Sequence, residues 1–187
     1  LFIKTKNKTF SKILQSDKSN NDLLMKQILD FFKENNLKFD DISKIFVNQG
    51  PGNFSGLRGS LAIAKGVSLS KNLNLFGYNT FIWSCAKFFN KKDSIFSLIK
   101  FREKYFVKKF DKNLKSTSKI EEVTVDEIIN KYDNKFNVIP KNVIKHFDEK
   151  ILKLNNLSIV DLDHNELEFL QLKGLLDEEL IKPLYLS

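Results

Sequence analysis

The feature that most constrains the fold is a glycine-rich stretch at residues 50–66, in a chain with only seven glycines. It follows an apolar run at residues 45–47, so the pattern predicts a strand, a tight turn and a helix. Gly50 and Gly52 permit backbone angles that a side chain would forbid, and Pro51 fixes its own φ angle between them. We therefore expect backbone to come close to another group at this turn.

The turn is open to two interpretations. Its backbone N–H groups could bind a phosphate, or the glycines could serve only a tight turn and close helix packing, which the pattern alone favours. A Walker P-loop is excluded because no Gly-Lys-Ser/Thr follows. Asn53 or Ser55 is expected to cap the helix. The residues of this glycine turn are Gly50, Pro51, Gly52, Asn53, Phe54, Ser55, Gly56 and Arg58.

The turn and its helix resemble the signature of a known family. Residues 50–58, Gly-Pro-Gly-Asn-Phe-Ser-Gly-Leu-Arg, and residues 62–67, Ala-Ile-Ala-Lys-Gly-Val, are similar to the GPGSFTGLR and AKGL motifs of the TsaB (YeaZ) family. The resemblance implies an α/β fold of the actin-like ATPase (ribonuclease H-like) kind with two small lobes. The closing segment at residues 181–187 is also similar to the family's proline-x-tyrosine-leucine end.

The resemblance also implies a division of the chain. In the family a strand that ends in Asp-Thr comes first, and residues 1–4 match the strand after it. We therefore expect the first family strand, with the acid that ATP-binding relatives place near the metal, to be missing here, by truncation or by loss. Residues 1–82 are expected to form an N-terminal lobe, and residues 83–187 a more divergent second lobe whose C-terminal segment returns to the first.

Two expected helices, at residues 22–36 and 55–71, carry much apolar or small surface. In the first, apolar side chains cover an arc of about 160°, more than the roughly 100° that a core-facing stripe needs. In the second, small residues would let another helix approach closely. Either the first helix is deeply buried or part of it meets a second protein; the resemblance implies pairing with a partner's equivalent helices. The expected interface residues are Leu24, Met25, Ile28, Phe31, Phe32, Gly59, Ala62, Ile63 and Gly66.

The rest of the chain predicts an alternating α/β pattern. Strands are expected at residues 1–4, 9–14, 44–47, 73–77, 95–99, 105–107 and 136–139, with a long connection at 111–122. Helices are expected at residues 23–35, 55–71, 80–89, 125–131 and 164–176, with a helix or turn at 143–154. Asn20, Asn21 and Asp22 are expected to cap the first helix.

The net charge of +8 invites a nucleic-acid hypothesis, but the composition weakens it. Arg58 and Arg102 are the only arginines among 31 basic residues, which is typical of a genome-wide bias toward A/T-rich codons. The lysines look scattered, so we expect no basic arm and only weak electrostatic association with RNA. The single cysteine, Cys85, and the absence of a long apolar run favour a cytoplasmic protein with no membrane segment.

No catalytic constellation is visible in the sequence. His146 and His164 each lack a second ligand at helical spacing. Where the paralogous transferase TsaD carries a His-x-x-x-His metal motif, residues 79–86 hold no such pair, so an older metallopeptidase-like label for this glycoprotease-like family finds no support. We expect no catalytic residue, no metal and no cofactor.

The resemblance implies a non-catalytic dimerisation subunit of the complex that places threonylcarbamoyl on the tRNA adenosine beside the anticodon. Its expected partners are a TsaD-type catalytic subunit, a TsaE-type ATPase that docks on the heterodimer, and tRNA through the complex only, with a homodimer when the chain is alone. The alternative is an actin-like ATPase or threonylcarbamoyl transferase that acts by itself.

Overall fold

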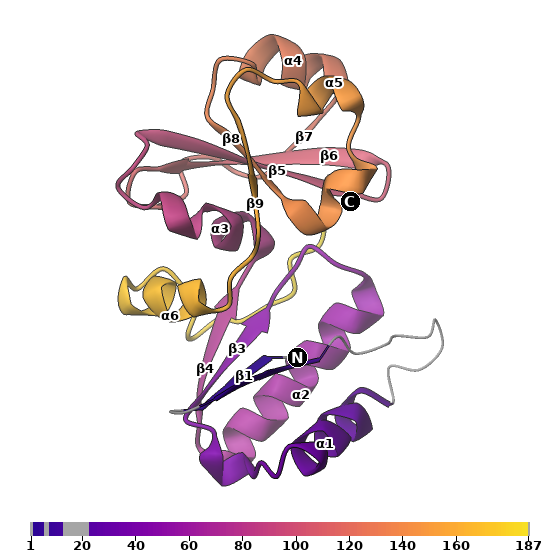
Figure 1. Ribbon diagram of the computed structural model, residues 1–187, viewed down its shortest axis with the longest axis vertical. Helices are drawn as coiled ribbons and strands as arrows, with labels where there is room; N and C mark the ends of the chain where they lie inside the picture. Colours follow the sequence, from indigo (N-terminus) through magenta and orange to yellow (C-terminus); the bar gives the residue numbers. More distant parts are fainter. Residues whose placement is uncertain (1, 6–7, 13–22, 187) are drawn as a thin grey trace. The chain divides into compact units, whose positions relative to one another are not determined.

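The computed structural model describes residues 2–5, 8–12 and 23–186. The chain forms two compact units: the first contains Leu1–Tyr78 and Leu176–Tyr185, and the second contains Asn79–Leu175. Figure 1 shows how the chain leaves the first unit and ends with a segment that lies along it again. The expected helix caps at residues 20–22 and the end of the expected strand at residues 9–14 lie outside the described residues.

The first unit contains two separate two-stranded sheets. Strand β1 (Phe2–Lys4) pairs antiparallel with β2 (Thr9–Ser11). Strand β3 (Lys44–Asn48) pairs in parallel with β4 (Asn74–Tyr78). Two-stranded sheets need other elements to cover them, because a pair of strands alone is marginally stable in water.

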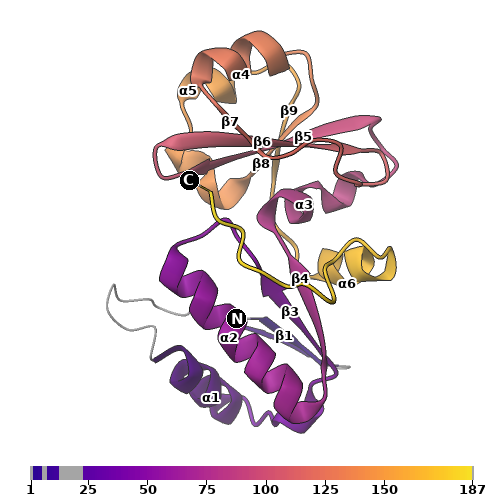
Figure 2. The same ribbon diagram turned by 180° about the vertical axis from the view of Figure 1, so that it is seen from behind.

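Two helices provide that cover. Helix α2 (Phe54–Lys71) lies against β3 and β4, and α1 (Leu24–Glu34) lies beside α2 (Figure 2). Their apolar side chains form two small buried clusters, one on each pair of strands. The first cluster contains Val47, Leu61, Ala64 and Ile181, and the second contains Ile3, Phe31 and Phe32.

The second unit is built on one mixed sheet in the order β7-β6-β5-β8-β9. Strands β5 and β6 form a hairpin paired over its whole length, and β8 and β9 run parallel to β5. The strands are β5 (Ser94–Phe101), β6 (Lys104–Asp111), β7 (Glu121–Val123), β8 (Asn137–Pro140) and β9 (Leu157–Val160).

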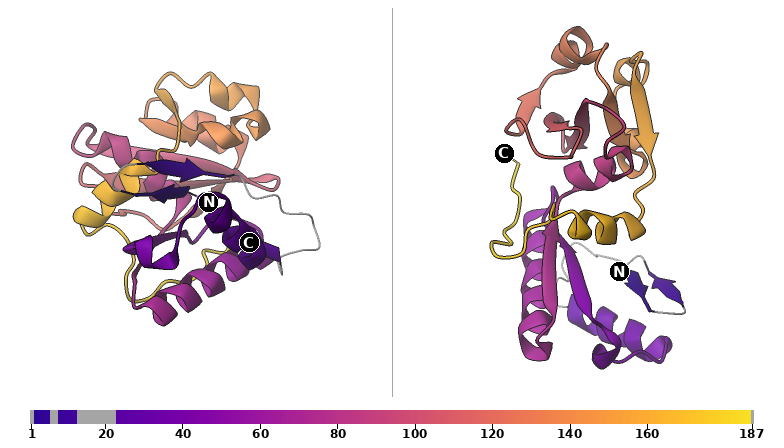
Figure 3. Two further views of the ribbon diagram at one scale, coloured as in Figure 1. Left: turned by 60° about the horizontal axis from the view of Figure 1, so that its bottom comes forward. Right: turned by 90° about the vertical axis from the view of Figure 1, so that its left-hand side faces the viewer.

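Helices cover both faces of this sheet (Figure 3). Alternate residues of β5 point to opposite faces, so Leu98 packs with Ile128 and Ile151 from α4 and α5, whereas Ser97 faces α3 and its hydroxyl lies 2.9 Å from that of Ser84. The helices are α3 (Thr80–Cys85), α4 (Val125–Tyr132), α5 (Glu149–Leu152) and α6 (Asn165–Leu172), with 3₁₀ turns at Ala86–Phe88 and Lys141–His146.

Most expected elements are confirmed, with three differences. The connection at residues 111–122 ends in the short strand β7, and β9, whose four residues include the polar Ser158, was not expected. The expected helix or turn at residues 143–154 is a 3₁₀ turn followed by α5, because Asp148 accepts a bond from the Lys150 N–H and starts a new helix there. Among the described residues, no helix has the length and apolarity needed to cross a bilayer.

Candidate functional site

The glycine turn joins the end of β3 to the start of α2, as the sequence predicts. Gly50 has a φ angle of +124°, a left-handed conformation that side chains rarely adopt. A Cβ atom on Gly50 would lie 2.9 Å from the backbone oxygen of Leu184. Gly52 has no such φ angle, so only Gly50 carries the predicted special backbone conformation. The close approach that Gly50 permits is to the C-terminal segment of the same chain.

Asn53, rather than Ser55, caps the helix. Its side-chain oxygen accepts a bond of 2.6 Å from the backbone N–H of Gly56. A Cβ atom on Gly56 would lie 2.5 Å from that same oxygen, so glycine here leaves room for the cap. One N–H group at the helix start is therefore already occupied by a side chain of the protein.

The C-terminal segment, Leu176–Tyr185, is fastened to both strands of the β3–β4 pair. At the end of β3, the Leu184 N–H donates to the Gln49 oxygen over 2.6 Å, and the Gln49 side-chain amide donates to the Lys182 oxygen over 3.0 Å. On β4, Gly77 and Asp177 exchange two backbone bonds of 2.7 and 2.9 Å. These bonds fix the segment against the turn.

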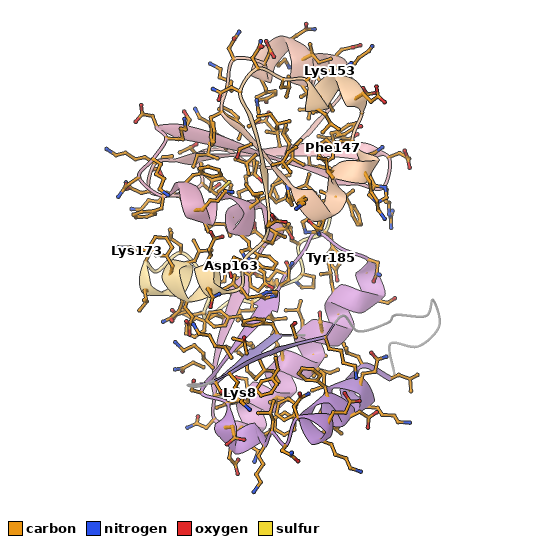
Figure 4. All side chains as sticks on the ribbon, viewed as in Figure 1. Lys8, Phe147, Lys153, Asp163, Lys173 and Tyr185 are labelled. Carbon is orange, nitrogen blue, oxygen red and sulfur yellow. The ribbon has the colours of Figure 1, made fainter. Side chains whose placement is uncertain are left out.

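Two glycine-turn residues form an exposed cluster with the C-terminal segment. The rings of Phe54 and Tyr185 stack with centroids 5.2 Å apart, although 50% and 46% of these residues remain exposed. The Arg58 guanidinium lies 4.2 Å from the Phe54 centroid and donates to the Tyr185 hydroxyl over 3.2 Å. Figure 4 labels Tyr185 beside the start of α2. Sequence reasoning named Phe54 and Arg58 but did not find their aromatic neighbour.

The expected interface residues of α1 divide by burial. Phe31 and Phe32 are only 3% and 7% exposed because they pack with Ile3 in the chain's own core, so they are not available to a partner. Leu24, Met25 and Ile28 are half-buried. Leu29, which the sequence analysis did not select, is 46% exposed.

Helix α2 presents a more open surface. Ala62 and Gly66 are exposed, and Gly59 and Ile63 are half-buried. A Cβ atom on Gly59 or Gly66 would meet nothing within 4 Å, so these glycines have no packing reason among the described residues of this chain. Leu69, one turn beyond Gly66, is 83% exposed and was missed because the sequence analysis ended its interface at Gly66.

Cys85 and His164, two side chains of the second unit that could react, pack against other residues of the fold. Cys85 is fully buried, and this burial raises the pKa of its thiol to about 12, which keeps it protonated and unreactive at neutral pH. Burial lowers the pKa of His164, whose ring lies 5.0 Å from that of Trp83. Within the described residues, no three His, Cys, Asp or Glu side chains are grouped closely enough to hold a metal ion.

The chain is similar to known proteins in sequence and in fold. Residues 14–100 match the family model for TsaD, tRNA N6-adenosine threonylcarbamoyltransferase. A tRNA threonylcarbamoyladenosine biosynthesis protein TsaB from Buchnera aphidicola subsp. Baizongia pistaciae is 42% identical over 50 residues, which are 27% of this chain and 23% of that protein. The match therefore spans about a quarter of that relative's length.

Two solved structures from Pseudomonas aeruginosa are similar over almost the whole chain. One, described as an uncharacterized protein with similarity to peptidase YEAZ, has a TM-score of 0.68 at 12% identity and covers 100% of this chain and 93% of its own. The other, YeaZ, has a TM-score of 0.63 at 14% identity. This match covers 99% of the present chain and 92% of the YeaZ chain. At these identities the likeness shows the fold, which is the expected actin-like (ribonuclease H-like) α/β fold.

Proposed function

We propose that this chain, whose sequence match and fold support its assignment to the TsaB (YeaZ) family, is a non-catalytic subunit of the complex that makes threonylcarbamoyladenosine in tRNA. Its role is to pair through α1 and α2 with a TsaD-type catalytic subunit and to stabilise that subunit's active form. A TsaE-type ATPase then docks on the heterodimer, and tRNA reaches the chain only within the complex.

The observation that carries this proposal is the open surface of α2. A glycine in a helix interior costs about 1 kcal/mol relative to alanine, so Gly59 and Gly66 require a reason outside the helix. The described part of this chain supplies none, because the space above both glycines is empty. The small residues let a second helix pack on α2 at a short interaxial distance. The neighbouring Leu69, which is 83% exposed, offers that helix an apolar contact.

Pairing is tested by mixing the chain with its cognate TsaD-type subunit and measuring mass by light scattering. We expect a heterodimer at micromolar concentrations, whereas persistent separation would contradict the proposal. The same measurement on the chain alone shows whether it forms a homodimer through the same helices.

The surface is tested with one pair of matched variants. Leu69→Glu places a charge on the open surface of α2, and Leu172→Glu makes the same change at a 78% exposed leucine of α6 in the second unit. We expect Leu69→Glu to weaken pairing at least tenfold and Leu172→Glu to leave it unchanged. Circular dichroism should show both variants folded; equal loss in both would place the interface elsewhere. Ala62→Glu is a further exposed variant, whereas Ala64 is unsuitable because it is buried against β3.

The match to the TsaD family model favours one alternative, an ATPase or transferase that acts by itself. Such an enzyme would bind nucleotide at the glycine turn. Calorimetry with ATP and Mg²⁺ separates the two functions, because clear micromolar binding by the isolated chain would support the alternative. We expect no binding, since Asn53 and the C-terminal segment already occupy the turn.

A further inference from the structure

Residues 87–119 form a strongly basic segment. They hold eleven lysines and arginines against three aspartates and glutamates, an excess of eight, whereas residues 120–187 carry an excess of six acidic residues. Lysines occur along the whole chain, as expected, but acidic residues are few in this segment.

The fold gathers part of this segment at one end of the β5–β6 hairpin. Ser94 pairs with Asp111, so the residues before β5 and after β6 lie together, and the Asn90 N–H donates to the Lys112 oxygen over 2.7 Å. The next loop folds back beside β6, where the Thr117 N–H donates to the oxygen of Lys109. We define the basic end of the hairpin as Lys92, Lys109, Lys112 and Lys115.

Aromatic rings hold two of these lysines in place. The Lys92 ammonium lies 4.5 Å from the centroid of Phe136, and the Lys109 ammonium lies 5.6 Å from that of Phe96. The two rings belong to adjacent backbone, since the Phe96 N–H donates to the Phe136 oxygen over 2.9 Å. Cation–π contacts orient an ammonium group without neutralising its charge.

The ion pairs of the hairpin differ between its two ends. At the turn end, Lys100 lies 3.5 Å from Glu103 and Lys104 lies 2.9 Å from Glu122. At the basic end, no lysine takes part in an ion pair with any residue that the structure describes. Two acids, Asp93 and Asp111, also lie at this end, and Asp111 accepts two backbone bonds from the following loop.

We propose that the basic end of the β5–β6 hairpin binds the phosphate backbone of tRNA. Ammonium groups that are not engaged in ion pairs bind a polyanion by releasing its counterions, whatever its sequence. The identity of the polyanion as tRNA rests on the proposed function. The second unit thus contributes affinity for the substrate of the complex, while the first unit contributes the subunit contact.

The experiment compares two triple variants with the same change in net charge. K92Q/K112Q/K115Q removes three exposed lysines from the basic end, and K104Q/K131Q/K141Q removes three exposed lysines that already have acidic partners. The affinity for tRNA is measured by fluorescence anisotropy at several salt concentrations, for the complex with the catalytic subunit and for the chain alone. Thermal melts check that both variants fold.

The expected result is a slope of log affinity against log salt that is shallower by about 3 for the basic-end variant and by less than 1 for the control. The weakening should be the same for unrelated tRNA sequences. Equal slopes for the two variants would overturn the proposal, because net charge alone would then explain binding. Loss of binding to anionic phospholipid vesicles without any change for tRNA would overturn it in favour of a membrane surface.

The same samples separate this inference from the proposed function. If the wild-type chain fails to join the catalytic subunit, the proposed function is wrong, whatever the salt slopes are. If the basic-end variant joins normally and keeps the wild-type slope, only the inference about tRNA is wrong.

Discussion

The two units of this protein differ in how completely they bury their apolar side chains. All twelve of the largest side chains that are less than 2% exposed lie in the second unit, among them Phe81, Leu98 and Ile139. Among the described residues, six of the eight large apolar residues that remain exposed lie in the first unit: Leu23, Leu29, Phe54, Leu69, Leu180 and Tyr185. In the part of the chain that the structure describes, the second unit therefore buries its apolar side chains more completely than the first.

This difference in burial shows which of the two units depends on a segment from elsewhere in the chain. The second unit surrounds a five-stranded sheet with its own helices, and every member of its core cluster around Leu98 lies within residues 79–175. The first unit has two separate pairs of strands, and it needs Leu176–Tyr185 to cover β3 and β4. Its remaining exposed leucines are the surface that we propose a partner subunit covers.

Deletion of residues 176–187 should have the largest effect, because it should destabilise the first unit and leave the second unit folded. The deletion removes the buried Ile181 and the bonds to Gln49 and Gly77, which together are worth about 5 kcal/mol. We expect backbone amides of β3 and β4 to lose protection in hydrogen exchange while those of β5 and β8 keep it. Loss of protection in the second unit as well would show that the two cores are not independent.

Matched leucine truncations test the contrast in burial. Leu98 lies on β5 and is fully buried under the helices that cover this face of the sheet, whereas Leu69 is 83% exposed on α2. Leu98→Ala should lower the free energy of unfolding by about 3 kcal/mol, and Leu69→Ala by about 0.5 kcal/mol or less. Urea denaturation measures both, and similar losses would mean that Leu69 is covered in solution.

Alanine substitutions at two glycines of the first unit should change the free energy of unfolding in opposite directions. Gly50→Ala should cost about 2 kcal/mol, because Gly50 has a positive φ angle and faces the Leu184 oxygen. Gly59→Ala should stabilise the isolated chain by about 1 kcal/mol, because it raises helix propensity in open space. Thermal or urea denaturation checks both signs. A destabilising Gly59→Ala would indicate that the chain self-associates through α2.

The smallest effect is a pH dependence located in the second unit. Burial lowers the pKa of His164, so its neutral form contributes stability above its ordinary pKa near 6.5, and that stability is lost as the pH falls further. The pKa of Glu166 is raised by burial and acts in the opposite direction. The wild type should therefore lose more stability than His164→Phe between pH 7 and 5. Parallel curves for the two proteins would exclude this role for His164.

Local signals predicted the glycine turn and the hairpin well. The apolar runs at residues 95–99 and 105–107 predict β5 and β6, and the polar residue before α2 predicts its cap, because both depend on neighbouring residues. The second lobe matches the family motifs only weakly, yet its fold is complete. A closed core requires apolar side chains of suitable size rather than a particular motif.

Contacts between distant residues could not be predicted in this way. Gln49 bonds to Lys182 across 133 positions, and only the family resemblance suggested that the C-terminal segment returns. The helical period of α2 does not reveal that Ala64 is buried and Ala62 exposed, because the helix is small on most sides. Likewise, counting lysines does not show which of them have acidic partners.

The return of the C-terminal segment affects the order in which the protein can fold during synthesis. The second unit is continuous in the chain, so it can close as soon as its last strand and helix leave the ribosome. The first unit must wait for Leu176–Tyr185. At about 5–20 residues per second, translation of the intervening chain leaves the nascent β3 and β4 without their completing segment for about 5–20 s. During that interval the apolar side chains that Ile181 later covers, Val47, Leu61 and Ala64, stay exposed and offer a chaperone a place to bind.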